Sequence, residues 1–528
     1  MAQSTLDSGE DKLVIRLLHK IAAVGNKLPE PTTLFFMIAG AVIVASAIFA
    51  GFVVDDVMMP TEDGDYVKQS VQVQSLLTHE GIQWMYLSAV DNFVTFAPLG
   101  PVLMVMLGIG IAERTGLIAT GLKMMVMSVP DNWITATLVF ACVMSSIAAD
   151  AGYVVMIPLG GLLFAGLGRH PMAGIAAAFA GVSAGFSANL SLTGLDPMLA
   201  ELTNEAASIR DPQYEVMVTA NYYFLVVSTF LVTAVCTIVT HRIVEPMLGE
   251  WDSSQASEPI EEPEMPSKEE RRNVWCALGV AGLVTGFIAF LGIWPLSPLR
   301  DLTLLGVESS WLDDLQPYFS RFDVLLTLLF FLPGLVYGIL QGSITGDGDV
   351  VEMANETMAT MGAYVVLAFP AGQFIAYFDW SNLDIAVAEV GVQVLTAVGA
   401  DSMPIVLLIA FIIVSGIINL IIGSASAKWA VMAPAFVPML MGMGLSPELV
   451  QAGYRVGDSV TNIITPLMSY LPIIIVFARK YVKDIQIGTL LTLMLPYSVA
   501  LGIAWTVMLI IWLWLGVPIG PGAEAFYP

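Results

Sequence analysis

The sequence predicts an all-α polytopic membrane protein with nine transmembrane helices and two re-entrant hairpins arranged as an inverted repeat. Of the 528 residues, 57% are hydrophobic and only 12% are charged, which is about half the charged share of a soluble domain. The apolar residues form continuous blocks that can span a bilayer as helices, unlike the alternating pattern of a membrane barrel. This composition excludes an ordinary soluble enzyme and a disordered chain.

Nine apolar segments are long enough to cross a bilayer as single helices. They are residues 33–54, 93–113, 171–190, 215–243, 273–295, 322–341, 356–378, 447–478 and 486–516. The eighth segment is long and contains Pro466 and Pro472, which predict a break in the helix. The N-terminal segment, residues 1–32, is polar and lacks the early apolar run of a signal peptide.

Two further apolar stretches are interrupted near their centres by small polar residues. Residues 133–168 are interrupted at 145–152, and residues 402–444 at 423–428. Each stretch could be two passes joined by a tight turn, or a re-entrant hairpin whose tip ends inside the membrane. Irregular backbone at that depth requires surrounding protein or a water-filled cavity.

The positions of Lys and Arg favour the hairpins and indicate the orientation of the chain. With a cytoplasmic N-terminus and hairpins that return to their own side, most basic residues lie inside. The acidic segment 246–272 is then a cytoplasmic linker between a first transmembrane half, residues 33–245, and a second half, residues 273–516. The C-terminal tail, residues 517–528, is expected outside.

The two halves contain a repeated segment. Residues 149–183 align without gaps with residues 425–459. The matched pairs include Pro158 with Pro434, Gly168 with Gly444, and Pro171 with Pro447. Because the first copy enters from inside and the second from outside, the repeat is inverted. Inverted repeats with broken helices are typical of secondary transporters, whose binding sites lie near the bilayer midplane.

Each predicted hairpin is followed by a pass with a polar break, at residues 183–197 and 457–466. An unwound segment offers oxygen ligands to a small hard cation, and helix N-termini beside it favour an anionic group. The alternative is that these polar residues only pack helices together. Two breaks at equivalent places favour a site, and we expect a possible Na⁺ position near Asn189 and Asn462.

Ionisable residues inside the membrane are functional candidates, because each costs roughly 2.5–3.5 kcal/mol to insert. The candidates are Asp150, Asp196, Lys428, Arg455 and Asp458. Lys428 and Arg455 could clamp the carboxylates of a substrate while Trp429 stacks on its ring. Alternatively, Arg455 pairs with Asp458 at i, i+3 only to order the helix, and Lys428 extends outward to the surface.

Other classes of function find little support in the sequence. The net charge of −25 disfavours nucleic acid as a partner. The three cysteines have no paired spacing, and no catalytic or ATP-binding motif is present. We therefore expect a protein that is not an enzyme and has no cofactor apart from a coupling ion.

Several segments resemble the AbgT (p-aminobenzoyl-glutamate transporter) family over nearly the whole chain. The residues that carry this resemblance are 149–158, 189–197, 424–434 and 454–466. The resemblance implies a homodimer in the bacterial inner membrane, with nine transmembrane helices and two re-entrant hairpins in each protomer. The positions linked to transport in the family match Asp196, Ser426, Trp429, Pro447, Arg455, Asp458 and Pro466.

The resemblance also implies a function, which is ion-gradient-driven secondary transport of p-aminobenzoyl-glutamate or related aromatic carboxylates. Some family members are described as exporters of sulfonamides and p-aminobenzoate. We expect Lys428 to join the substrate-binding residues, and Na⁺ or H⁺ to be the coupling ion. The expected coupling residues are Asp150, Asn189, Asp196, Asp458, Thr461 and Asn462. The alternatives are a sodium-coupled dicarboxylate carrier of the wider ion transporter superfamily and, from another class, an ion channel.

Overall fold

The computed structural model describes most of the chain and is mainly helical. The described residues are 31–60, 66–148, 151–252, 256, 265–300, 315, 317–318, 321–397, 399, 403–420, 422–465, 468, 470–483 and 485–527. Two predicted site residues, Asp150 and Pro466, lie outside this set, as do residues 253–255 and 257–264 of the predicted linker.

The helices divide between the two predicted halves of the chain. The first half contains α2 (Pro31–Ile48), α3 (His79–Val94), α4 (Leu99–Arg114), α5 (Leu117–Met127), α6 (Ile134–Met144), α7 (Ala151–Gly166), α8 (Pro171–Phe179), α9 (Leu195–Ser208), α10 (Tyr222–Val239) and α11 (Glu245–Leu248). The second half contains α12 (Lys268–Ile293), α15 (Phe322–Gln341), α16 (Asp347–Thr360), α17 (Gly362–Trp380), α18 (Leu383–Ala397), α19 (Pro404–Asn419), α20 (Ala425–Met441), α21 (Pro447–Asn462), α22 (Leu471–Arg479) and α23 (Ile487–Leu515).

Six helical stretches of the described residues are long and apolar enough to cross a membrane. The number rises to at most eight if two bent helix pairs each form one span. One pair, α5 with the helix that follows it, bends by 119°, and the other, α16 with α17, bends by 46°. These spans support a multi-pass membrane protein, while the arrangement of nine helices and two hairpins stays a prediction.

The expectation of an all-α fold is wrong in one place. Strands β1 (Val53–Pro60) and β2 (Tyr66–Gln72) form an antiparallel two-stranded sheet. The first predicted pass therefore ends at Ile48 rather than at residue 54. The β-branched residues Val53 and Val54 favour an extended backbone, and Gly51 has a φ of +84°, which a helix cannot continue.

Both predicted hairpins consist of two helices with a break between them, which matches the interruptions in the sequence. In the first, α6 and α7 are separated by a short 3₁₀ segment, η3 (Ser145–Ala148). In the second, α19 and α20 are separated by residues 420–424. The ends of the hairpins also correspond, because Gly168 and Gly444 have φ values of +69° and +82°.

The helix after each hairpin begins in the same way and is then interrupted. Pro171 opens α8 and Pro447 opens α21, at a helix position where proline costs no hydrogen bond. The helix α8 continues into a π segment, η4 (Ala180–Ala184), and ends. The helix α21 ends at Asn462, before α22 begins. The break predicted in the eighth pass is therefore present.

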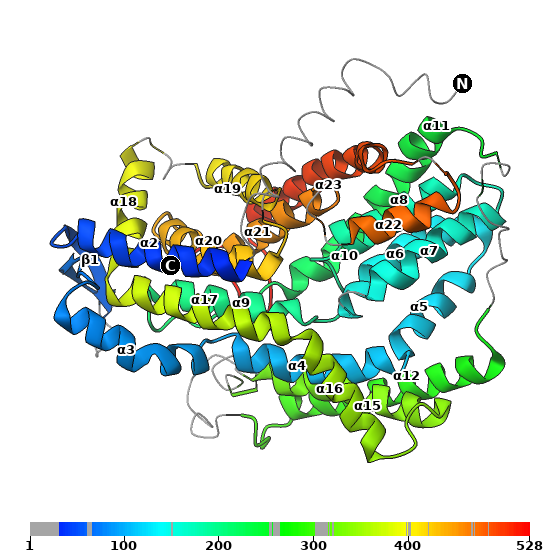
Figure 1. Cartoon of the computed structure of the whole chain (residues 1–528), viewed down its shortest axis with the longest axis horizontal. Helices are drawn as coiled ribbons and strands as arrows, with labels where there is room; N and C mark the ends of the chain where they lie inside the picture. Colours follow the sequence, from blue (N-terminus) through cyan, green and yellow to red (C-terminus); the bar gives the residue numbers. More distant parts are fainter. Residues whose placement is uncertain are drawn as a thin grey trace.

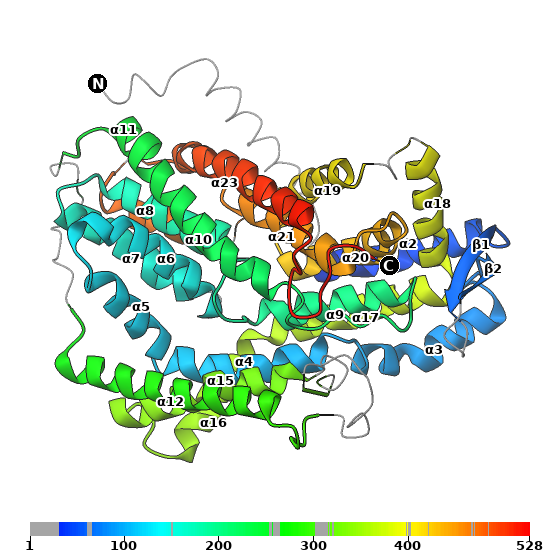
Figure 2. The same cartoon turned by 180° about the vertical axis from the view of Figure 1, so that it is seen from behind.

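Several helices were not expected as separate elements. The short amphipathic helix α9 has acidic residues on one face, such as Glu201 and Glu205, which lower its hydropathy. The helices α5 and α18 likewise fall outside the predicted passes, and α3 and α16 fall mostly outside them. Figures 1 and 2 place α9, α20 and α21 in the middle of the molecule, with α4, α15 and α12 along one side and α23 on the other.

The contact between α4 and α15 depends on glycines that bring the two backbones together. A Cβ on Gly108 would lie 2.4 Å from the carbonyl oxygen of Thr327. A Cβ on Gly334 would lie 2.7 Å from the backbone of Ala112. Close approach at small residues is a main source of helix association in a bilayer, where no hydrophobic effect drives packing.

We predict that Gly108→Ala destabilises the protein by about 1–3 kcal/mol, because the added methyl group meets backbone that cannot move aside. The matched control is Gly100→Ala on the same helix, where nothing lies within 4 Å of the added Cβ. Thermal unfolding of the detergent-solubilised chain should show a lower midpoint for the first variant alone. Equal midpoints for the two variants would contradict the close backbone contact.

Candidate functional site

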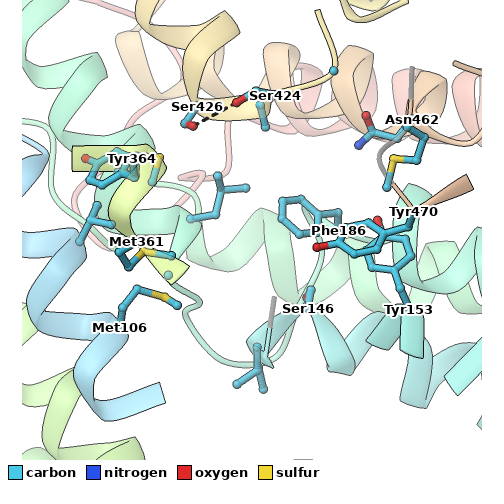
Figure 3. Close-up of a pocket in the computed structure, with 18 residues that line it drawn as sticks. Met106, Ser146, Tyr153, Phe186, Met361, Tyr364, Ser424, Ser426, Asn462 and Tyr470 are labelled. Atoms are coloured by element: carbon cyan, nitrogen blue, oxygen red, sulfur yellow. Dashed lines mark hydrogen bonds between the residues drawn. The ribbon is translucent and has the colours of Figure 1, made fainter. Parts of the chain in front are cut away.

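A cavity of about 350 Å³ lies where the two hairpin tips meet the two broken helices. Its lining residues come from α4, α17, both hairpins and both breaks (Figure 3). They are Val102, Met106, Ser146, Ile147, Tyr153, Phe186, Gly194, Leu195, Met198, Met361, Tyr364, Gly423, Ser424, Ala425, Ser426, Asn462, Met468 and Tyr470. This volume falls in the usual range of small-molecule sites.

The cavity wall is aromatic and uncharged. Tyr153 and Tyr470 stack with ring centroids 4.2 Å apart and an interplanar angle of 8°, near Phe186. Met106 and Tyr364 lie across the cavity from them (Figure 3). None of the described residues that line this cavity is Asp, Glu, Lys or Arg. The wall is therefore suited to a planar apolar group.

Helix N-termini supply the electrostatic attraction that the uncharged wall lacks. Ser424 caps α20 by accepting a hydrogen bond from the Ala427 N–H, and residues 423–426 line the cavity. Gly194, also in the lining, is the N-cap of α9. Free N–H groups and the helix dipole at such termini favour anions. Two helix ends, one from each half of the chain, therefore make the cavity suitable for an anionic group.

Lys428 is fully buried and forms an ion pair with Asp458. Its ammonium group also contacts the Oδ1 of Asn419 and lies 5.3 Å from the ring centre of Tyr454. The alternative in which Lys428 extends outward to the surface is therefore wrong. In this conformation Lys428 does not line the cavity, so its role as a substrate clamp stays a prediction.

Arg455 is 2% exposed and pairs with a carboxylate from the first half of the chain. Its Nη2 donates to the Oδ1 of Asp196 at 2.7 Å. Asp196 also accepts hydrogen bonds from the N–H and the hydroxyl of Thr193, at 2.6 and 2.9 Å. The alternative in which Arg455 pairs with Asp458 on the same helix is therefore wrong in this structure, because Arg455 pairs across α9 and α21 and Asp458 pairs with Lys428. The Nε of Arg455 is buried and has no partner.

Trp429 is buried behind the cavity rather than facing it. Its Nε1 donates to the hydroxyl of Thr203 at 2.9 Å, and its ring packs on Tyr454 with centroids 4.4 Å apart. Gln451 donates to the same hydroxyl at 2.7 Å. Trp429 therefore fixes α20 against α9 and α21, and in this conformation it does not reach the cavity.

Asn419, which the sequence did not single out, is the centre of a polar network at the second break. Its Nδ2 lies 2.8 Å from the backbone oxygen of Asp458, the hydroxyl of Thr461 and the Oδ1 of Asn462. A single Asn at the end of the apolar run 404–419 was the available signal. This residue links the second hairpin to the break that follows it.

The first half has a comparable link between its hairpin and its break. The Nδ2 of Asn189 donates to the hydroxyl of Ser146 at 2.9 Å, and its Oδ1 accepts from the Ser191 N–H. Of the described site residues, Ser426 and Asn462 line the cavity, whereas Pro447 begins α21 at the end opposite Asn462. The residues that are buried outside the lining are Asn189, Asp196, Lys428, Trp429, Arg455 and Asp458.

Helix–break–helix hairpins from two sequence repeats, meeting around a small-molecule cavity, define this chain as a membrane transport protein. A sequence model of the AbgT putative transporter family matches residues 16–527. The chain belongs to this family. It is 34% identical over 507 residues to the p-aminobenzoyl-glutamate transport protein of Escherichia coli (strain K12), covering 96% of each chain.

Two solved structures are similar over nearly the whole chain. The YdaH transporter of Alcanivorax borkumensis is 40% identical, with a TM-score of 0.83 over 93% of this chain and all of that one. MtrF of Neisseria gonorrhoeae, described with a class of antimetabolite efflux pumps, is 42% identical, with a TM-score of 0.89 over 96% of this chain and all of that one.

We predict that Arg455→Met destabilises the protein by about 3–5 kcal/mol, because Asp196 is left buried without its counter-charge. The double variant Arg455→Met/Asp196→Leu should recover much of this loss, since both charges are gone. Thermal unfolding in detergent measures the difference. Arg272→Met, which breaks an exposed pair with Glu269, should leave the midpoint unchanged. A double variant no more stable than the single one would contradict the pairing.

Proposed function

We propose that this chain is an ion-gradient-driven secondary transporter of p-aminobenzoyl-glutamate or related aromatic carboxylates. The observation that carries the proposal is an uncharged aromatic cavity with helix N-termini from both halves of the chain at its wall. The similarity to the p-aminobenzoyl-glutamate transport protein of Escherichia coli supports the choice of substrate.

The cavity suits the two chemical parts of such a substrate. A benzoyl ring would lie against Tyr153, Tyr470 and Phe186, where aromatic stacking is favourable. A carboxylate would lie at the N-terminus of α20, beside the hydroxyls of Ser424 and Ser426. A second carboxylate would recruit Arg455, whose Nε is unpaired.

Ion coupling would act through the two buried ion pairs. A proton on Asp458 or Asp196 would remove the counter-charge of Lys428 or Arg455 and free that cation for the substrate. Na⁺ would instead bind the side-chain oxygens of Asn462 or Asn189, with Thr461 as a further ligand. At Asn462 and Thr461 it would compete with the hydrogen bonds that these oxygens now accept from Asn419. In both cases the gradient changes the pairing of a charge that is costly to leave alone in the interior.

The proposed assembly is a homodimer in a bacterial inner membrane, with the N-terminus in the cytoplasm and the C-terminal tail outside. Export of sulfonamides or p-aminobenzoate is a second candidate function, favoured by the description of the Neisseria gonorrhoeae relative with antimetabolite efflux pumps. A sodium-coupled dicarboxylate carrier is less well supported, because dicarboxylates would leave the aromatic wall unused.

We predict that Trp429→Ala and Arg455→Ala abolish flux of labelled p-aminobenzoyl-glutamate in proteoliposomes. The first variant loosens α20 against α9, and the second removes the cation that pairs with Asp196. The matched controls are Trp275→Ala, whose ring is 66% exposed on α12, and Arg272→Ala. Flux at the wild-type level in either test variant would remove that residue from the proposed site.

Imposed gradients test the coupling and separate the rival functions. We expect saturable flux that follows an inward or outward Na⁺ or H⁺ gradient and that is inhibited by unlabelled aromatic carboxylate. Inhibition by succinate at similar concentrations would favour the dicarboxylate carrier. Conductance without saturation and without coupled substrate flux would favour an ion channel and contradict the proposal.

A further inference from the structure

A second cavity, of about 270 Å³, lies away from the transport cavity and shares no lining residue with it. It is formed where α3, α9, α17 and α20 meet the start of α18. Its lining residues are Asn92, Thr95, Phe96, Glu205, Ser208, Ile209, Gly372, Ile375, Ala376, Phe378, Asp379, Asp384 and Pro434. Three of these are acidic, and each comes from a different segment.

Two of the three carboxylates have an oxygen that is buried and has no partner. Asp384 is 1% exposed, and its Oδ1 accepts a hydrogen bond from the Ile385 N–H at 2.8 Å. Its Oδ2 has no hydrogen-bond partner, and neither does the Oε2 of Glu205. Buried polar atoms are almost always satisfied, so two such oxygens in the lining of one cavity point to a missing ligand.

No basic side chain of the described residues neutralises this group. Arg210, which follows the C-terminal end of α9, pairs instead with Glu389 of α18 at 2.6 Å. Glu201 and Asp379, which act electrostatically on Glu205, are both acidic. Asp379 is also the charged neighbour of Asp384. Asp384 is buried, whereas Glu205 is partly exposed and Asp379 is exposed. A buried carboxylate requires a counter-charge, which a bound cation or a proton would give to Asp384.

We propose that this second cavity binds a small monovalent cation, Na⁺ or H⁺, between Glu205 and Asp384. The amide of Asn92 and the hydroxyls of Thr95 and Ser208 add oxygen ligands of the kind that hard cations prefer. No group of three or more His, Cys, Asp or Glu side chains in the described chain could hold a metal ion.

Occupancy of this site would connect two parts of the molecule. Asn92 is on α3 and hydrogen-bonds Gln373 of α17 at 3.0 Å, whereas Glu205 is on α9. The helix α9 also carries Asp196, the partner of Arg455. A cation would therefore hold α9 against α3 and α17 at a distance from the transport cavity. The binding proposal itself does not rest on the proposed substrate.

The test uses the full-length detergent-purified chain and its thermal unfolding midpoint. The chain is titrated with NaCl against N-methylglucamine chloride at constant ionic strength, at pH 8 and at pH 6. The variants are Glu205→Gln and Asp384→Asn, which keep the side-chain shape and remove the charge. Glu352→Gln, on the exposed face of α16, is the matched control.

If the bound cation is Na⁺, we expect the unfolding midpoints of the wild type and the control to rise with NaCl at pH 8. In both amide variants the same rise should need at least tenfold more NaCl. For H⁺, the wild-type midpoint should instead rise from pH 8 to pH 6 without Na⁺, and the amide variants should lose that rise. At pH 8 without Na⁺, both amide variants should be at least as stable as the wild type.

Amide variants that respond to Na⁺ and to pH as the wild type does would overturn the proposal. Amide variants that are less stable than the wild type at pH 8 without Na⁺ would also overturn the proposal. Under those conditions the proposal leaves the carboxylates of the wild type without a counter-charge, so their removal should not lower stability. The unfolding midpoint is measured without a transported substrate. A negative result in the flux assays would therefore contradict the proposed function without contradicting cation binding at this second cavity.

Discussion

The neutralisation of buried charge is the constraint on which the centre of this structure depends. Lys428 and Arg455 lie in the protein interior, and each is stable there because a carboxylate from another element faces it. The Arg455–Asp196 pair joins the second half of the chain to the first, and the Lys428–Asp458 pair joins α20 to α21. The removal of one charge from such a pair costs much more than the loss of an exposed pair.

This constraint also explains how an uncharged cavity can serve an anionic substrate. In our proposal, the wall would attract the substrate with helix N-termini and aromatic surface, while the two cations are paired outside the cavity lining. Asn419 accepts from the ammonium of Lys428 and donates to Asn462 in the cavity wall, so it connects the Lys428–Asp458 pair to the cavity. In our proposal, ion binding and substrate binding compete for the same set of buried charges.

The sequence predicted the features that depend on local backbone chemistry. Gly444 and Pro447 mark the hairpin end, because left-handed backbone and helix starts select these residue types. The ion-pair partners could not be predicted, because Asp196 and Arg455 are far apart in the sequence and only tertiary packing brings them together. The helix α9 was missed because its acidic face hides it from a hydropathy search, and Tyr470 because nothing local relates it to Tyr153.

The binding of labelled p-aminobenzoyl-glutamate to Asp458→Asn, with and without Na⁺ and at two pH values, tests the central claim most directly. In this variant Lys428 has lost its counter-charge, so we expect it to bind the substrate with an affinity that no longer depends on the coupling ion. An affinity that keeps the wild-type dependence on Na⁺ and pH would contradict the claim that this ion pair couples the two.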